Sequence, residues 1–222
     1  MASTKKPSVD AVLVGFGWTG AIMGMELTAA GLNVLALERG EMRDTNADFA
    51  YPRITDELAY GIRGKLFQNL AKETVTVRHN PGDIAVPYRQ LGSFLPGNGV
   101  GGAGVHWNGQ QWRALPDDLR IRSRVEERYG KKMIPADMHL QDWGVSYDEL
   151  EPYFDHFEKV CGVSGKAGNL RGQIQAGGNP FEGARSDDYP LPPLTSPVSS
   201  QLFEKASREL GYHPFPQAAA NA

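Results

Sequence analysis

Residues 10–40, DAVLVGFGWTGAIMGMELTAAGLNVLALERG, contain the pattern that decides the fold. The apolar residues 12–14 are typical of a buried parallel strand. Residues 21–30 are rich in Ala, Met, Leu and Glu, which favour a helix, and Gly31 follows where helices commonly end. Residues 33–37 indicate a second strand. This order of strand, helix and strand predicts a βαβ unit, in which the two strands are parallel.

Three glycines between the first strand and the helix have the spacing G-x-G-x-x-G. Gly15 permits a tight turn, Gly17 lets the main chain approach a pyrophosphate, and Gly20 lets helix and strand pack closely. The helix N-terminus, at Trp18 and Thr19, offers N–H groups and a partial positive charge to the phosphates. These five residues are the predicted dinucleotide contacts of the first loop.

An acidic residue follows the second strand. Glu38 lies 18 residues after Gly20, close to the spacing expected for a carboxylate that accepts a hydrogen bond from a ribose hydroxyl. A carboxylate there disfavours a 2′-phosphate, so NADP is the poorer fit. The neighbouring Arg39 is included in the predicted site. The alternative is a glycine-rich turn with a purely structural role, but the complete order of elements favours a dinucleotide site.

A second glycine-rich stretch, GNGVGGAGVHWNGQQWR, spans residues 97–113. Its glycines lack Cβ atoms, so the backbone N–H groups can lie against a ligand. A long cofactor with its pyrophosphate on the first loop would extend its other half past this second loop, and FAD fits that description better than NAD. The alternative is a flexible surface loop, which the large apolar side chains of Trp107 and Trp112 argue against. The predicted contacts in this stretch are Gly97, Gly101, Gly102, His106 and Asn108.

The overall composition argues against several classes of protein. A formal net charge of −3 is unlike that of a nucleic-acid binder, which needs a positive excess to neutralise phosphates. The single cysteine, Cys161, cannot form an internal disulfide, and the five scattered histidines show no metal-ligand spacing. No targeting signal is recognisable, and no apolar run reaches the ~18 residues of a membrane span. The sequence by itself therefore predicts a soluble, cytoplasmic protein.

A helix with a defined start is predicted after residue 146. Ser146 and Glu149 have the spacing of a capping box. Pro152 suits the first turn of a following helix. Asp155 and Glu158 are expected to be solvated acids on its polar side. The apolar stripe of this helix, expected to face the core, consists of Tyr153, Phe154, Phe157 and Val160.

The remaining segments give weaker signals. A last helix is predicted over residues 198–210, and the residues expected to face inward are Leu202, Phe203, Ala206 and Leu210. Residues 163–197 are rich in Gly, Pro and Ser, which indicates a loop or linker. Residues 117–132 concentrate positive charge, typical of a solvated helix face with interspersed acids or, alternatively, of a surface that docks a partner. Residues 41–95 show no clean period and indicate either a segment that covers the cofactor or irregular packing.

Four stretches together resemble the glucose–methanol–choline oxidoreductase family. They are DAVLVGFGWTGAIMGMEL, VLALERG, GNGVGGAGVHWNGQQWRALPDDL and DWGVSYDELEPYFDHFE. More narrowly, the chain resembles the bacterial flavoprotein branch that contains gluconate 2-dehydrogenase and related sugar dehydrogenases. The resemblance implies FAD as cofactor and oxidation of a CH–OH group of a sugar or sugar acid. Hydride would pass to the flavin, and electrons would then leave for a cytochrome or another acceptor.

The resemblance also implies an architecture and partners. The expected fold is α/β, a Rossmann-like parallel sheet with flanking helices, incomplete in this chain. Residues 1–40 would form the βαβ unit, residues 41–162 the rest of the N-terminal FAD-binding domain, and residues 163–222 a linker with the start of a substrate domain. The implied partners are a small subunit and a cytochrome c subunit, on the periplasmic side of the inner membrane.

Family members are far longer than this chain. We therefore expect an N-terminal portion of such an enzyme, inactive by itself. The histidine that takes the hydroxyl proton is expected beyond residue 222, so no catalytic residue is assigned here. Two other interpretations stay open: an NAD-dependent dehydrogenase, and a non-catalytic binding module on the same scaffold.

His106 stands in a V-H-W context in which some branches of the family carry a histidine bonded to the 8α-methyl group of the flavin. The resemblance thus implies two alternatives. One is a covalent histidyl–flavin link, which suits imidazole because its neutral nitrogen is nucleophilic near neutral pH. The other is a histidine that only hydrogen-bonds the cofactor or packs beneath it.

Overall fold

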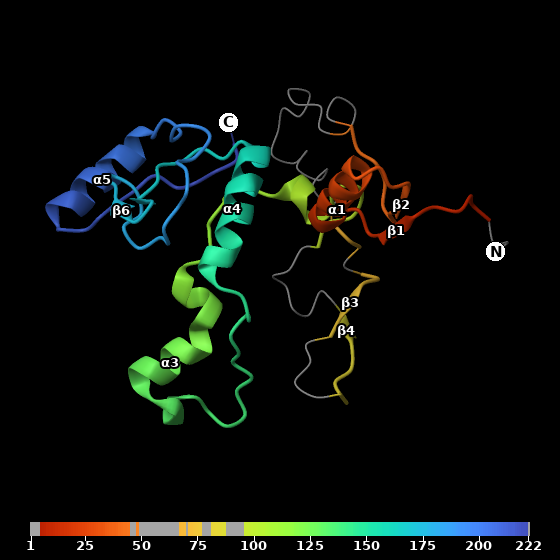
Figure 1. Cartoon of the computed structure of the whole chain (residues 1–222), viewed down its shortest axis with the longest axis horizontal. Helices are drawn as coiled ribbons and strands as arrows, with labels where there is room; N and C mark the ends of the chain where they lie inside the picture. Colours follow the sequence, from red (N-terminus) through yellow and green to blue (C-terminus); the bar gives the residue numbers. More distant parts are fainter. Residues whose placement is uncertain are drawn as a thin grey trace. The chain divides into compact units, whose positions relative to one another are not determined.

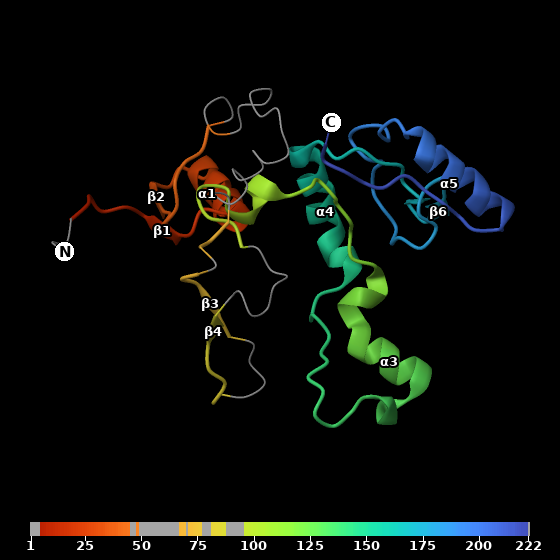
Figure 2. The same cartoon turned by 180° about the vertical axis from the view of Figure 1, so that it is seen from behind.

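The computed structural model describes residues 5–44, 48, 67–69, 71–76, 81–87 and 96–221. The chain divides into two compact units, Met1–Trp107 and Asn108–Ala222. Most of residues 41–95, for which the sequence predicted irregular packing or a covering segment, lie outside the described residues. Figures 1 and 2 show the elements of each unit from opposite sides.

The first unit contains the predicted βαβ arrangement. Strand β1 (Ala11–Val14) pairs with β2 (Val34–Leu37) in parallel, with register from Ala11 opposite Val34 to Val14 opposite Leu37. Helix α1 (Trp18–Ala29) connects the strands and packs against both (Figure 1). The predicted strand–helix–strand order is confirmed. The larger parallel sheet stays a prediction, because the described residues contain this one parallel pair.

The burial expected for the first strand is wrong. Val12 is 53% exposed and Val14 is 86% exposed. Parallel strands are normally covered on both faces, which is why their sequence is apolar throughout. Here the two-stranded pair has α1 as its neighbouring helix, and alternate residues of β1 point into solvent.

Two smaller elements complete the described part of the first unit. Strands β3 (Thr74–Val75) and β4 (Val86–Pro87) form a short antiparallel pair. The second glycine-rich stretch folds into a 3-10 helix, η3 (Gly102–His106). Its N-cap, Gly101, has φ +96°, a left-handed conformation that favours glycine.

Most regular elements of the second unit are helices. Its elements in chain order are η4 (Pro116–Arg120), α3 (Ile121–Tyr129), η5 (Lys131–Met133), α4 (Tyr147–Cys161), β5 (Asn169–Leu170), β6 (Gln173–Ile174) and α5 (Val198–Glu209). In the basic segment, arginines pair with acids nearby: Arg122 Nε lies 3.0 Å from Glu126 and Arg124 Nε 2.9 Å from Asp117. This pattern matches the expected helix face with interspersed acids.

Helix α4 begins and ends where its sequence indicates. The Ser146 hydroxyl accepts a hydrogen bond from the Glu149 N–H (3.2 Å), and the Glu149 carboxylate accepts one from the Ser146 N–H (2.8 Å). These bonds lower the pKa of Glu149. Gly162 ends the helix with φ +62°. The position predicted for Pro152 is wrong. Pro152 lies inside α4 and not in the first turn of a following helix, because the capping box already starts the helix at Tyr147.

Two expectations about the faces of α4 are also wrong. Tyr153 and Val160, expected in the core, are exposed, whereas Glu158, expected in solvent, is buried. Glu158 is buried because two arginines from distant segments share its carboxylate. A buried carboxylate is tolerated in a protein only when such partners compensate its lost hydration.

The arginine pair consists of Arg113 and Arg185. Arg113 donates from Nε and Nη2 to the two oxygens of Glu158 at 2.9 and 2.8 Å, and Arg185 contacts the same carboxylate. Arg113 Nη1 also donates to Glu151 at 2.9 Å. Burial by itself would lower the pKa of Arg113, but the hydrogen bonds to Glu158 and Glu151 outweigh it and raise that pKa. We call these four residues the buried ion cluster.

The predicted linker, residues 163–197, contributes to the core of this unit. Val163 and Ala167 are fully buried, and Arg185 of the buried ion cluster belongs to the same segment. Ser164 exchanges backbone hydrogen bonds with Ala219 at 2.8 and 3.0 Å. The segment is irregular in secondary structure, as predicted, but it is packed.

Within the described ranges, no helix is both long and apolar enough to cross a membrane. The same residues contain no group of three or more His, Cys, Asp or Glu side chains placed to hold a metal ion.

Replacing Glu158 by Gln would leave two buried guanidinium groups without their shared carboxylate. We expect Glu158→Gln to lower the free energy of unfolding by about 3–5 kcal/mol, measured by urea denaturation. Glu204→Gln is the matched control, because the exposed pair of Glu204 with Arg208 should contribute less than about 1 kcal/mol. Equal effects of the two substitutions would contradict a compensated buried carboxylate.

Candidate functional site

The first glycine loop, residues 15–20, makes a tight turn between β1 and α1. Gly15 has φ +90°, and its N–H donates to the Leu37 carbonyl oxygen at 2.7 Å, which ties the loop to β2. A Cβ atom on Gly20 would overlap the Gly15 carbonyl oxygen. The close packing predicted for Gly20 is therefore present, and its neighbour is the turn itself.

The N-terminus of α1 provides an anion-binding environment. The N-cap residue is Gly17, which has no side chain to accept hydrogen bonds from the first turn, and no acidic residue lies in that turn. The first N–H groups of an α-helix have no acceptor within the helix, and the helix dipole adds a partial positive charge there. The first turn, with Trp18 and Thr19, can thus receive a phosphate group.

Glu38, directly after β2, stabilises the first loop through hydrogen bonds. Its carboxylate accepts hydrogen bonds from the Phe16 N–H at 2.8 Å and from the Gly40 N–H at 2.9 Å. The bond from Phe16, followed by that from Gly40, lowers the pKa of Glu38. A carboxylate has about four lone-pair positions, so two of them are left for a ligand hydroxyl. The adjacent Arg39 forms an ion pair with Glu73 at 3.2 Å.

The second glycine stretch lies directly on the first loop. The Gly101 N–H donates to the Phe16 carbonyl oxygen at 2.8 Å, and Gly101 and Gly17 form a parallel backbone bridge. A Cβ atom on Gly102 would come within 3.0 Å of Gly17 Cα. A Cβ atom on Gly97 would in turn overlap the backbone of Gly102 and Ala103. The missing side chains allow backbone to pack against backbone at this contact.

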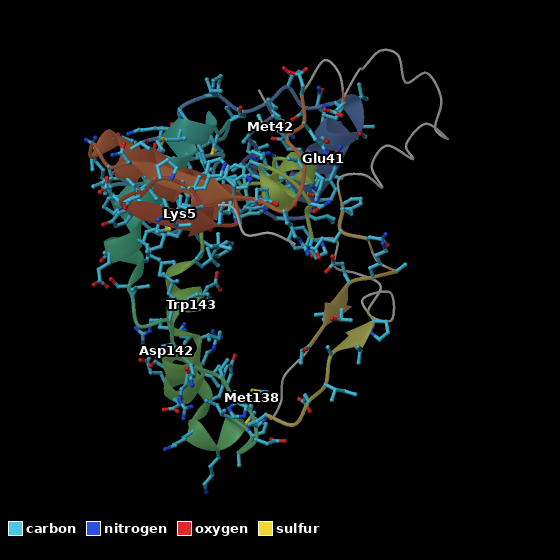
Figure 3. All side chains as sticks on the ribbon, turned by 90° about the vertical axis from the view of Figure 1, so that its right-hand side faces the viewer. Lys5, Glu41, Met42, Met138, Asp142 and Trp143 are labelled. Carbon is cyan, nitrogen blue, oxygen red and sulfur yellow. The ribbon has the colours of Figure 1, made fainter. Side chains whose placement is uncertain are left out.

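A second backbone contact joins the segment that follows β2 to the second glycine stretch. The Val100 N–H donates to the carbonyl oxygen of Glu41 at 3.1 Å, and a Cβ atom on Gly40 would overlap Gly99. Glu41 is labelled in Figure 3, on the segment that follows β2. The two glycine stretches, about eighty residues apart in sequence, therefore form one continuous backbone surface, which we call the paired glycine loops (residues 15–20 and 97–104).

Two aromatic rings pack against each other at one end of the paired glycine loops. The rings of Trp18 and Trp107 meet edge to face, with centroids 5.1 Å apart. A Cβ atom on Gly104 would overlap the Trp18 indole, so this glycine provides the space for that ring. Such perpendicular packing is a preferred arrangement of aromatic pairs.

His106 is the last residue of η3 and packs against Phe67, with ring centroids 4.6 Å apart. Its Nε2 atom is buried and has no hydrogen-bond partner among the described residues. Buried polar atoms are normally satisfied, so an unpaired imidazole nitrogen indicates a group that a ligand can complete. Asn108, in contrast, begins the second unit, where its carbonyl oxygen accepts a hydrogen bond from the side chain of Asn221 at 3.1 Å.

These residues fit an elongated anionic ligand that carries both phosphate and ring systems. The first turn of α1 suits the phosphates, and the Glu38 carboxylate suits a hydroxyl group. The unpaired Nε2 atom of His106 adds a polar group.

The sequence did not predict the roles of Phe16, Glu41 and Phe67. Phe16 acts through its backbone and Glu41 through its carbonyl oxygen, so their side-chain types give no signal.

Comparison with known proteins finds that the chain is similar to parts of several longer dehydrogenases. It is 56% identical over 216 residues to the gluconate 2-dehydrogenase flavoprotein of Pantoea cypripedii, a match that covers 96% of this chain and 35% of that protein. The family resemblance is confirmed. The chain is also 26% identical over 242 residues to the fructose dehydrogenase large subunit of Gluconobacter japonicus, across 97% of this chain and 37% of that protein.

A further relative is the 2-methyl-1,2-propanediol dehydrogenase of Mycolicibacterium austroafricanum, 27% identical over 214 residues, across 96% of this chain and 33% of that protein. The chain thus spans about a third of the length of the curated relatives it matches. No family model matches the chain.

Two glycines of α1 test the packing of the first loop. Gly20→Ala should lower the free energy of unfolding by about 1–3 kcal/mol, because its methyl group would overlap the Gly15 carbonyl oxygen. Gly24→Ala should raise it by about 0.5–1 kcal/mol, since alanine favours a helix and its Cβ would lie 3.4 Å from the Phe16 ring, an ordinary contact. Guanidinium denaturation measures both, and a stabilising Gly20→Ala would contradict the observed packing.

Proposed function

We propose that the paired glycine loops bind FAD, as part of an oxidoreductase that oxidises a CH–OH group of a sugar or sugar acid. The observation that carries this proposal is the backbone contact of Gly101 with Phe16, which joins the two loops into one surface. The names of two relatives, a gluconate 2-dehydrogenase flavoprotein and a fructose dehydrogenase large subunit, support the same reaction type.

The first loop would hold the pyrophosphate. Gly17, Trp18 and Thr19 would present backbone N–H groups to its oxygens, and the N-terminal end of α1 would stabilise their charge. Glu38 would accept a hydrogen bond from a ribose hydroxyl while it keeps its bonds to Phe16 and Gly40. Arg39 would lie at the edge of this part of the site.

The second loop would support the other half of the cofactor. Gly97, Gly101 and Gly102 would contribute by letting the backbone segments beneath the cofactor pack closely together, and His106 would pair its Nε2 atom with it. Asn108 would contribute from the start of the second unit. When bound, FAD supplies the hydride acceptor of the reaction.

The division of the chain and the partners belong to the same proposal. Residues 1–40 and 41–162 would form the FAD-binding domain, and residues 163–222 would lead into a substrate domain. A cytochrome c subunit or another acceptor would receive the electrons, and a small subunit would be a further partner, on the periplasmic side of the inner membrane. The base that removes the hydroxyl proton would come from outside this chain, so the chain alone would bind FAD without turnover.

An NAD-dependent dehydrogenase is not favoured. NAD needs one glycine loop. If NAD were the cofactor, the close contact of the second loop with the first would have no role in binding it. Two of the relatives named above are a flavoprotein and a sugar dehydrogenase subunit. A non-catalytic module is disfavoured by the intact α1 N-terminus and the available lone pairs of Glu38.

Gly17→Ala separates ligand binding from folding. A Cβ atom on Gly17 would lie 3.7 Å from Gly102 Cα, an ordinary contact, so the free energy of unfolding should change by less than about 1 kcal/mol. The same methyl group would occupy the space that a pyrophosphate needs. We expect FAD affinity, measured by fluorescence titration, to fall at least about tenfold. Gly24→Ala is the control, with unchanged affinity. A wild-type chain that bound NAD but not FAD would contradict the proposal.

We propose in addition that His106 forms a covalent bond to the 8α-methyl carbon of the flavin, because its Nε2 atom is buried and has no hydrogen-bond partner in the part of the chain that the structure describes. The bond would replace a C–H bond of that methyl group and the N–H bond of the imidazole, and the flavin itself would take up the two electrons and become reduced. Flavin should then stay with the protein after acid denaturation of the holoprotein, detected as a fluorescent band on a denaturing gel. His106→Ala should abolish the band while FAD still binds reversibly. Release of all flavin from the wild-type protein would show that His106 only contacts the cofactor.

A further inference from the structure

Helix α5 exposes the apolar side that its sequence would be expected to bury. Val198, Leu202, Ala206 and Leu210 follow one another at intervals of four, and Phe203 lies next to Leu202, which places these apolar residues on one side. Their exposed fractions are 71% for Val198, 63% for Leu202, 71% for Phe203 and 74% for Leu210, the residue that caps the helix. The expectation that Leu202, Phe203, Ala206 and Leu210 face inward is therefore wrong for this structure.

The side of α5 that does pack is polar. Ser207 is the one buried residue of the helix, and Glu204 is half-buried and pairs with Arg208 at 2.8 Å. The Gln201 side chain donates to the Ser196 carbonyl oxygen at 2.8 Å. An amphipathic helix that turns its polar side inward leaves its apolar side for another surface.

A groove borders the exposed side of α5 at Phe203. It has a volume of about 680 Å³ and is lined by the rings of Trp112, Phe203 and Phe215 together with prolines and Leu194. Trp112 is 52% exposed and meets Phe215 edge to face, with centroids 6.2 Å apart. Phe203 belongs both to the groove and to the stripe on α5, so the two form one apolar surface, which we call the α5 surface.

We propose that the α5 surface docks an apolar polypeptide segment from the part of such proteins that this chain does not cover. The matched relatives have about two residues outside the aligned region for each residue inside it. A surface that spans a helix of twelve residues and a neighbouring aromatic groove is longer than a sugar-sized ligand. A polypeptide with apolar residues on one side covers both parts, by the helix-in-groove mode of recognition.

The lining of the groove favours a polypeptide over a charged small molecule. Glu204, its one charged lining residue, is already paired with Arg208. The remaining lining groups are aromatic, proline and small polar side chains, as at the core of a protein–protein interface.

Co-expression tests the proposal. The tagged 222-residue chain is produced together with the portion of the Pantoea cypripedii gluconate 2-dehydrogenase flavoprotein that lies outside the match, as a separate chain. We expect the two chains to purify as a complex. Leu202→Glu should weaken it at least about tenfold, because a carboxylate would replace a buried apolar side chain. Gln201→Glu, on the other side of α5 and with the same charge change, should leave the affinity unchanged.

Each outcome of this experiment either supports the proposal or overturns it. Circular dichroism of the free variants establishes that both keep their helices, which Leu202→Glu should do because Leu202 is exposed. A wild-type pair that does not associate would overturn the proposal, and so would a Leu202→Glu complex as tight as wild type. A homodimer of the chain alone that Leu202→Glu dissociates would assign the surface to a second copy instead. FAD binding is measured separately and does not enter the result.

Discussion

The first unit depends on a backbone contact between two glycine loops, in which the Gly101 N–H donates to the Phe16 carbonyl oxygen. This contact requires glycine at position 102, since a Cβ atom there would crowd Gly17. The Glu38 carboxylate fixes the same turn from β2 through the Phe16 and Gly40 N–H groups. Backbone that is held in this way needs little rearrangement when it receives a ligand, and pre-organisation of this kind reduces the entropic cost of binding.

The segments of the second unit are joined by a buried carboxylate and not by a large apolar core. Arg113 and Arg185 share the Glu158 carboxylate, and few large apolar side chains of this unit are fully buried. Buried ion pairs seldom add net stability over apolar packing, but they are costly to break, so they specify one arrangement of the segments that they join. Three segments distant in sequence meet at this carboxylate.

Exposed apolar surface is common to both units. Val14 in β1 and Leu202 in α5 are far more exposed than such residues usually are in a parallel strand or an amphipathic helix. The docking proposed for the α5 surface would cover the second of these residues.

The sequence by itself determined the local elements and the family. The βαβ unit, the capping box of α4 and its glycine end followed from residues close in sequence, where backbone preferences and short-range hydrogen bonds decide. The tertiary structure decided which residues are buried. Glu158 was predicted in solvent and the apolar stripe of α5 in the core, and both were wrong, because burial depends on partners from distant segments. Contact between the two glycine loops was likewise visible only in the fold, since it is made by backbone atoms that every sequence contains.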